Sequence, residues 1–138
     1  MKELKKINFD DYLKSFDYQE RVDMKIQKAE LIELYAQNRV ELIDIRFNEE
    51  WEAWHLGIGK HIPLNEIPNR LSEIDKTKIV VTMCPHYDRA EIARIYLKLQ
   101  GFNARYLTDG MLGIVDYLRG DKARDYMNKI KDKIKCIN

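Results

Sequence analysis

The sequence predicts an α/β domain with a mostly parallel central sheet and helices on both of its faces. Segments with the apolar, β-branched content of buried strands alternate along the chain with segments of helical periodicity. The clearest strand is KIVVT at 78–82, and the clearest helix follows it at 88–100, ended by Gly101. A length of 138 residues fits one domain of ordinary size.

The first half of the chain contains the lead-in to the sheet and its first strong strand. Residues 8–22 mix aromatic and charged side chains and predict one or two helical turns packed on the domain. A short strand at 24–26 precedes a helix at 27–38, in which apolar residues recur at helical spacing. The segment VELIDI at 40–45 has the content of a buried strand.

The rest of the chain continues the same alternation. We expect a short helix at 48–54, a loop around Gly57 and Gly59, an extended piece at 61–63, a helical turn at 67–71, a strand at 104–107, a helix at 111–118 and an amphipathic helix at 121–135. We therefore divide the chain into an N-terminal helical extension (1–23), a main domain (24–120) and a C-terminal helix (121–138) packed on that domain.

Composition narrows the classes of function. The formal net charge is +1, so we expect no nucleic-acid partner, and no apolar run approaches the roughly 18 residues of a membrane span. The basic start lacks the apolar core of a signal peptide, which predicts a cytoplasmic protein. With two cysteines, no CxxC and three histidines, we predict free thiols, no metal site and no cofactor.

The turn after KIVVT, CPHYDRAE, is the candidate site. Ligands of parallel sheets bind beyond the carboxyl ends of the strands, and Cys84 lies at that place. The amides at the start of the next helix carry partial positive charge, so we predict a lowered pKa for the Cys84 thiol. A buried cysteine without a reactive role, and a surface Arg89 without a special partner, are the alternative interpretations.

Asp88 and Glu91 have the spacing of a capping box, D-x-x-E, at the start of the helix. We therefore predict that the Asp88 carboxylate accepts hydrogen bonds from amides of the first helical turn. The same negative charge would oppose a thiolate on Cys84.

The chain resembles the rhodanese-like family in several segments whose order and spacing match. These segments are LIDIR at 42–46, EEWEAWHL at 49–56, IPL at 62–64, CPHYDRA at 84–90 and GFNARYLTDG at 101–110. The resemblance implies the rhodanese fold, in three layers, and sulfurtransferase chemistry. Cys84 would take sulfane sulfur from a small-molecule or protein persulfide donor, hold it as a persulfide and pass it to a thiol or another nucleophile. Pro85, His86, Tyr87, Asp88 and Arg89 would form the loop that cradles the charge.

Loop length argues against phosphatase activity. In the dual-specificity phosphatases of this fold, five residues separate cysteine and arginine, which makes room for a phosphate; here four residues, 85–88, lie between Cys84 and Arg89. The shorter loop suits a cysteine that carries one extra sulfur.

Some positions depart from the family pattern. Tyr87 replaces a frequent glycine, Ala90 a frequent serine and Met111 the second glycine of a pair, while Pro85 removes one loop amide. Further members of the matched segments have structural interpretations: we expect Asp44 and Arg46 to be structural residues near the site, and Glu50 and Trp51 to serve packing or a salt bridge.

These departures keep two other functions open. One is a catalytically weak binding or regulatory module of the same fold, and the other is a thiol redox sensor. We expect Cys136 to be a bystander rather than a thiol that resolves a Cys84 persulfide. His86 could orient a donor or protonate a leaving group, or have no role. The sequence leaves the oligomeric state open.

Overall fold

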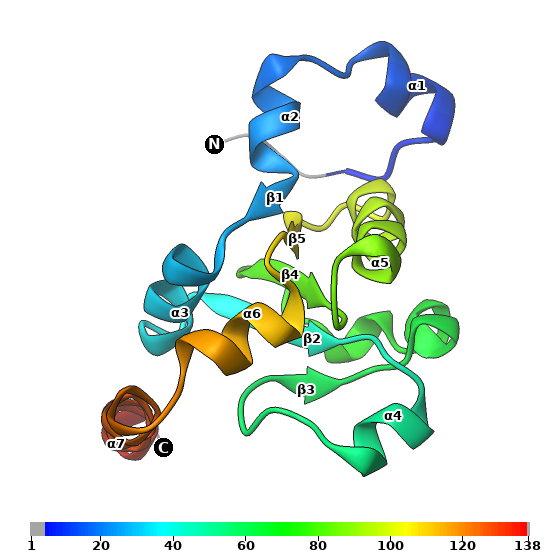
Figure 1. The fold of residues 1–138 in the computed structure, drawn as a ribbon. Helices are drawn as coiled ribbons and strands as arrows, with labels where there is room; N and C mark the ends of the chain where they lie inside the picture. The colour runs from blue at the N-terminus through cyan, green and yellow to red at the C-terminus, as the bar shows by residue number, and fades with distance from the viewer. Residues whose placement is uncertain (1–4, 138) are drawn as a thin grey trace.

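The computed structural model of the chain describes the backbone of residues 5–137 and the side chains of residues 5–131. A five-stranded sheet forms its centre (Figure 1). The strands are β1 (Lys25–Ile26), β2 (Val40–Asp44), β3 (Lys60–His61), β4 (Ile79–Met83) and β5 (Ala104–Leu107). Their order is β1-β5-β4-β2-β3, and every neighbouring pair is parallel.

The register places the segments that follow β2 and β4 next to each other, at the carboxyl ends of the strands. Asp44 at the end of β2 is paired with Met83 at the end of β4. The residues that follow these strands, Arg46 and Cys84, therefore leave the sheet at the same edge.

Helices cover both faces of the sheet and bury a separate apolar layer on each (Figure 1). On one face lie α3 (Lys28–Ala36), α6 (Gly110–Tyr117) and α7 (Asp121–Ile137); on the other lie α5 (Asp88–Leu99) and the 3-10 helices η1 (Leu64–Asn69) and η2 (Leu71–Glu73). The first layer includes Leu31, Ile114 and Tyr126, and the second includes Ile67, Ala93 and Leu97. A short helix, α4 (Asn48–Ala53), lies between β2 and β3 in the chain.

The N-terminal extension is fastened to the domain through a buried arginine. It contains α1 (Phe9–Lys14) and α2 (Tyr18–Asp23). Arg94 on α5 is 2% exposed and donates hydrogen bonds to Tyr12 Oη (2.8 Å), to Glu20 Oε2 (2.6 Å) and to the carbonyl oxygen of Ala104 (2.9 Å). Each extension helix thus supplies one acceptor to this guanidinium.

The predicted three-layer α/β class is confirmed, and each predicted strand and helix is present. Most boundaries differ by a residue or two, as at α6, which begins at Gly110 rather than at Met111. The helical turn expected at 67–71 is replaced by the two 3-10 helices η1 and η2, which start at Leu64 and Leu71. In the described part of the chain, no helix is both long enough and apolar enough to cross a bilayer.

Candidate active site

The candidate site is the loop between β4 and α5. Cys84 follows β4 directly and its side chain is completely buried, with a relative exposure of 0%. The next residues lie nearer the surface: Pro85 is half-buried, while His86 and Tyr87 are exposed. Arg89 lies in the first turn of α5. The sulfur therefore lies beneath the exposed residues of the loop.

The first turn of α6 fixes the shape of this loop. The amide of Met111 donates to the carbonyl oxygen of Cys84 (2.8 Å), and the amide of Leu112 donates to that of Pro85 (3.3 Å). The first amides of a helix have no partner inside the helix, so the loop carbonyls satisfy them. Two carbonyl groups of the loop thus point toward α6.

Gly110 makes this close approach possible. Its φ is +70°, a conformation that favours glycine, and a Cβ atom there would lie 2.2 Å from the Pro85 carbonyl oxygen and 2.3 Å from that of His86. No other residue fits without moving the loop. The sequence reasoning missed this role, although a glycine at the start of a helix was the available signal.

Burial and charge act on the Cys84 thiol in opposite directions. Burial, the largest effect, raises its pKa, and the negative charge of Asp88 raises it further. Backbone hydrogen bonds from Ala90, Arg89 and His86 lower the pKa. The net direction is upward, so the lowered pKa expected from the helix start is wrong for this resting structure: the desolvation of the sulfur outweighs the amides.

Asp88 does not cap the helix, and the predicted capping box is not formed. The structure places Asp88 inside α5, after Tyr87 as N-cap, and shows no side-chain hydrogen bond at this cap. The Glu91 amide bonds the Tyr87 carbonyl oxygen instead (2.9 Å). The Asp88 carboxylate faces the sulfur, and the Cys84 thiol donates to its Oδ1 at 3.8 Å.

Arg89 is held by a carboxylate from α4. Its two terminal nitrogens donate to Glu50 Oε1 (2.7 Å) and Oε2 (2.9 Å), a bidentate pair. The hydrogen bond from Arg89 lowers the pKa of Glu50 to about 2. The Phe47 ring lies 6.0 Å from the Arg89 guanidinium. Glu50 therefore has the salt-bridge position expected from the sequence, and Arg89 has a partner that the sequence did not identify.

Asp44 and Arg46 form a buried ion pair beside the site. Arg46 Nη2 lies 2.9 Å from Asp44 Oδ2, and both side chains are almost inaccessible. The same nitrogen donates to the Trp54 carbonyl oxygen (2.8 Å), and His61 Nε2 contacts the Arg46 carbonyl oxygen (2.8 Å). This network joins the end of β2 to α4 and β3. It fits the structural interpretation of both residues.

The structure thus brings Cys84, its loop and Arg89 together and keeps Asp44 and Arg46 paired with each other. The Cys136 side chain, for which a bystander role is predicted, lies outside the described side chains. In the part of the chain that the structure describes, no group of three or more histidine, cysteine, aspartate and glutamate side chains is placed to hold a metal ion.

The matched segments place this chain among known proteins. The sequence profile of the rhodanese-like domain matches residues 27–116. The chain belongs to the rhodanese-like domain family. The match begins after the N-terminal extension and includes every residue of the candidate site.

Relatives of this rhodanese-like chain differ in the function that their names state. The chain is 32% identical to the thiosulfate sulfurtransferase GlpE of Pseudomonas syringae over 69 residues, which are 50% of this chain and 65% of that protein. It is also 32% identical to an HTH-type transcriptional regulator of Mycobacterium tuberculosis over 93 residues, 63% of this chain and 39% of the regulator. The chain spans less than two thirds of the length of each.

A solved structure supports the same assignment. The rhodanese-like domain protein of Staphylococcus aureus superposes with a TM-score of 0.59 and 27% sequence identity, covering 64% of this chain and 88% of that protein.

Proposed function

We propose that this rhodanese-like protein is a sulfurtransferase that carries sulfane sulfur as a persulfide on Cys84. The observation that carries the proposal is the set of backbone amides around the sulfur. Backbone amides from the loop, at His86, and from the first turn of α5, at Arg89 and Ala90, favour the charged form of Cys84. The outer sulfur of a persulfide lies about 2 Å beyond Sγ, so the same amides would lie near its negative charge.

The reaction consists of two displacements at sulfur. The Cys84 thiolate attacks the outer sulfur of a donor R–S–SH. A bond from Sγ to that sulfur forms, the S–S bond of the donor breaks, and R–S⁻ leaves as a thiolate. An acceptor thiolate then attacks the same outer sulfur, and the Cys84 thiolate leaves. No net oxidation occurs, because each step breaks one S–S bond and forms another. The loop amides stabilise the negative charge of the persulfide between the steps.

The raised resting pKa fits a thiol that is charged only when a donor is present. Without a donor, the Asp88 carboxylate accepts the thiol hydrogen and burial disfavours the thiolate. A donor that enters the loop brings the sulfur to be attacked, and the amides around Sγ then stabilise the attacking thiolate.

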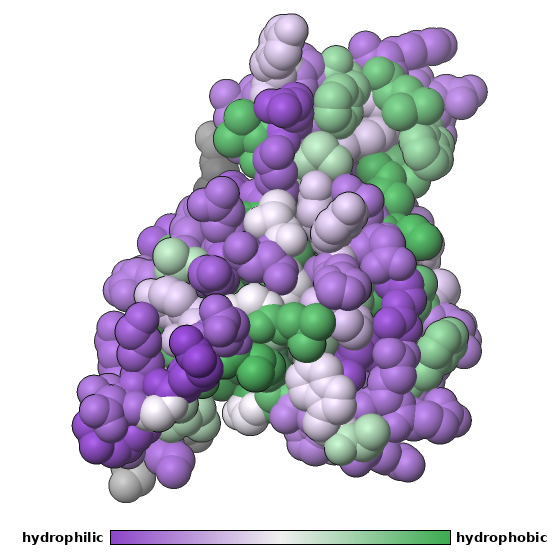
Figure 2. Space-filling view, in the orientation of Figure 1, coloured by the Kyte–Doolittle hydropathy of each residue, from purple (hydrophilic) through white to green (hydrophobic). Residues whose placement is uncertain are grey.

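The surroundings of the loop favour an organic donor over a small inorganic dianion. Exposed apolar side chains lie in the loop and on neighbouring elements: Phe47 before α4, Tyr87 in the loop, and Leu112 and Val115 on α6, whose first turn contacts the loop. Figure 2 shows such hydrophobic residues gathered over α6 on this face. Arg89 is already neutralised by Glu50, and Asp88 adds negative charge beside the sulfur. We therefore propose a persulfide of an organic thiol or of a protein as donor, with a thiol as acceptor.

Intact-mass measurement tests the proposal. Protein treated with an organic persulfide gains the mass of one sulfur atom and loses it again when thiol is added. Cys84→Ser abolishes the gain, whereas Cys136→Ser retains it. Thiosulfate loads the protein more slowly than the organic persulfide at the same concentration.

A binding or regulatory module is the second candidate. The complete burial and raised pKa of Cys84 favour it, because both reduce the reactivity of a thiol. An unchanged mass with organic persulfides and with thiosulfate, in a protein shown to be folded, would replace the sulfurtransferase by this module.

A further inference from the structure

A large cavity lies at the amino ends of the central strands, whereas Cys84 lies at their carboxyl ends. Its volume is about 930 Å³, and it is bordered by the amino ends of β4 and β5, the turn before β2, and side chains of α2 and α5. Ile79 lines this cavity and Cys84 follows the far end of β4, so at about 3.3 Å per residue the backbones of the two residues are roughly 17 Å apart. The cavity is therefore separate from the candidate active site.

Basic side chains dominate the lining. Six of the lining residues are cationic and two are acidic; the cations are Arg39, Lys76, Lys78, Arg94, Lys98 and Arg105. Arg94 is paired with the acid Glu20 at 2.6 Å. Five cations and a single carboxylate, Asp23, remain. Since the whole chain has a formal net charge of +1, the positive charge is concentrated here rather than spread evenly.

Three of the remaining cations have neutral groups as their direct partners, while Lys98 and Lys78 also interact electrostatically with the carboxylates of Glu20 and Asp75. Arg39 donates to the side-chain oxygen of Gln37 (3.3 Å), and Lys78 donates to that of Asn38 (3.0 Å). Lys76 lies over the Phe102 ring, 5.0 Å from its centre. Contacts of this kind leave the positive charges available to an anion.

Arg105 is the strongest sign of a missing partner. Its Nε is buried and has no hydrogen-bond partner among the described residues. A buried donor without a partner destabilises a fold, and a guanidinium has five N–H donors in a planar fork. An arginine in this state at the wall of a cationic cavity fits a site whose acceptor arrives from solution.

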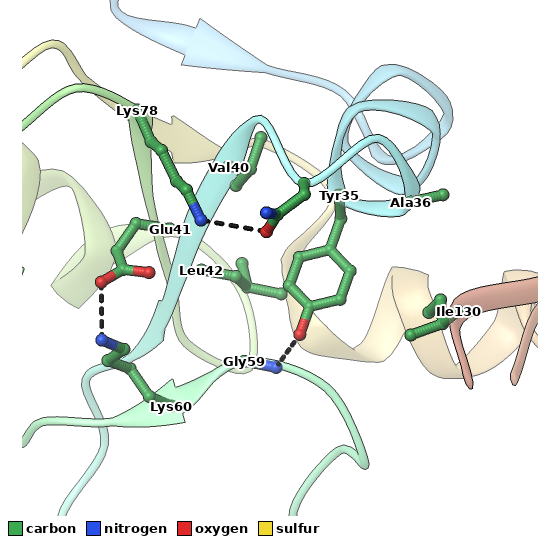
Figure 3. A pocket seen from close by; sticks show the side chains of 10 residues that line it. Tyr35, Ala36, Val40, Glu41, Leu42, Gly59, Lys60, Lys78 and Ile130 are labelled. Carbon is green, nitrogen blue, oxygen red and sulfur yellow. Dashed lines mark hydrogen bonds and ion pairs between the residues drawn. The ribbon is translucent and has the colours of Figure 1, made fainter. Parts of the chain in front are cut away.

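A neighbouring pocket provides a contrast. It measures about 200 Å³, and Lys78 lines it as well (Figure 3). Its other charged residues, Glu41 and Lys60, are paired with each other at 2.6 Å, and a hydrogen bond from the Gly59 amide to Tyr35 Oη (3.0 Å) crosses it. The unmatched positive charge therefore lies on the side of the larger cavity.

We propose that the larger cavity binds a small diphosphate-type anion, either free or as part of a nucleotide-sized phosphate ester. Arginine forks match phosphate oxygens in pairs, and lysines add charge without strict geometry. The volume lies within the 300–1,000 Å³ that is common for small-molecule sites. Several cations around one cavity suit a multiply charged ligand better than a monocarboxylate.

Calorimetric titration with inorganic pyrophosphate at fixed ionic strength of about 0.15 M tests the site. We expect saturable binding with a Kd of about 1 mM or lower. Arg105→Gln and Lys78→Gln each weaken it by about fivefold or more, and orthophosphate binds more weakly than pyrophosphate. A parallel titration with a nucleoside diphosphate separates the two sources, because tighter binding than that of pyrophosphate shows that the organic part also makes contacts.

Arg119→Gln is the matched control. This side chain is 75% exposed, lies outside the cavity lining and removes the same charge. The control keeps the wild-type Kd. Equal weakening by Arg119→Gln would reduce the effect to general charge attraction, and an absence of saturation at 10-fold above the expected Kd would overturn the proposal. Lys98→Gln serves in place of Arg105→Gln if the latter does not fold. Sulfur uptake by Cys84 is independent of every outcome.

Discussion

Asp88 keeps a negative charge next to the sulfur of the proposed nucleophile. The thiol of Cys84 donates to its carboxylate, and this charge raises the pKa of Cys84. Removal of the charge at constant size separates the electrostatic effect of Asp88 from its volume.

We expect Asp88→Asn to lower the Cys84 pKa and to speed its reaction with anionic donors. Two charges about 4 Å apart interact by about 1 kcal/mol even in a water-like medium, which corresponds to about fivefold in the thiolate population. The rate of Cys84 alkylation, followed against pH in both proteins, measures the change.

Glu91→Gln is the control for this substitution, since Glu91 is also acidic and lies in the same helical turn, but interacts with Tyr106 instead. In Glu91→Gln, we expect the pH dependence of Cys84 alkylation to equal that of the wild type. If the alkylation rate of Cys84 in Asp88→Asn rises at the same pH as in the wild type, or at a higher pH, the Asp88 charge does not raise the Cys84 pKa.

At the scale of elements, the start of α6 and the loop after β4 form one unit. The loop carbonyl groups accept from the amides of Met111 and Leu112, and Gly110 allows the contact. A side chain at Gly110 must displace the loop that surrounds the sulfur.

Gly110→Ala should destabilise the protein by more than about 2 kcal/mol, because the strain of a positive φ adds to the overlap with two loop carbonyl groups. The folded fraction should also take up persulfide sulfur more slowly. Urea unfolding gives the first quantity and mass spectrometry under folding conditions the second.

Gly120→Ala is the matched comparison for Gly110→Ala. Gly120 also has a positive φ, +53°, but no atom lies within 4 Å of a Cβ built there. Its substitution measures the backbone strain alone, at about 1 kcal/mol. Similar losses for the two variants would show that the loop yields to the added methyl group without cost.

The sequence predicts elements well where several signals agree. KIVVT reads as a strand and the segment after it as a helix, because apolar content, periodicity and a terminal glycine agree. Asp88 is different. The pattern D-x-x-E at a helix start predicts a cap, but it does not show whether another group competes for the carboxylate. Here the proximity of Cys84 decides, and that proximity depends on the loop in three dimensions.

Pairs of residues that are distant in the sequence could not be predicted either, because their contacts also depend on the three-dimensional arrangement. The residues Glu50 and Arg89 lie on α4 and α5, and only the parallel arrangement of β2 and β4 brings them together. The sign of the Cys84 pKa shift depends on how deeply the sulfur is buried, a quantity set by packing and not by position after a strand.

At the scale of the whole molecule, α7 contributes to the apolar layer under α3. Tyr126 and Ile130 are 8% and 6% exposed, and Tyr126 Oη donates to the Ile32 carbonyl oxygen at 2.8 Å. The described side chains that anchor α7 thus end at Ile130, ahead of Cys136.

Truncation after Asp132 should therefore leave sulfur transfer within a few-fold of the full-length rate, because both anchors remain. Truncation after Gly120 removes them and should cost about 3 kcal/mol or more. Single-turnover sulfur transfer and urea unfolding of the two shortened chains measure these effects. A large loss of sulfur transfer in the folded protein truncated after Asp132 would show that residues 133–138 take part in the reaction.

The guanidinium of Arg94 also has an evolutionary consequence. The family match begins at residue 27, yet two of the acceptors of this buried group, Tyr12 and Glu20, precede it. A lineage that lost the extension would retain a buried charge without its counterion, which is among the costlier defects of a folded core. Selection would then replace Arg94 by an apolar residue. In this chain, the packing of residues 5–23 and the burial of the Arg94 charge therefore depend on each other.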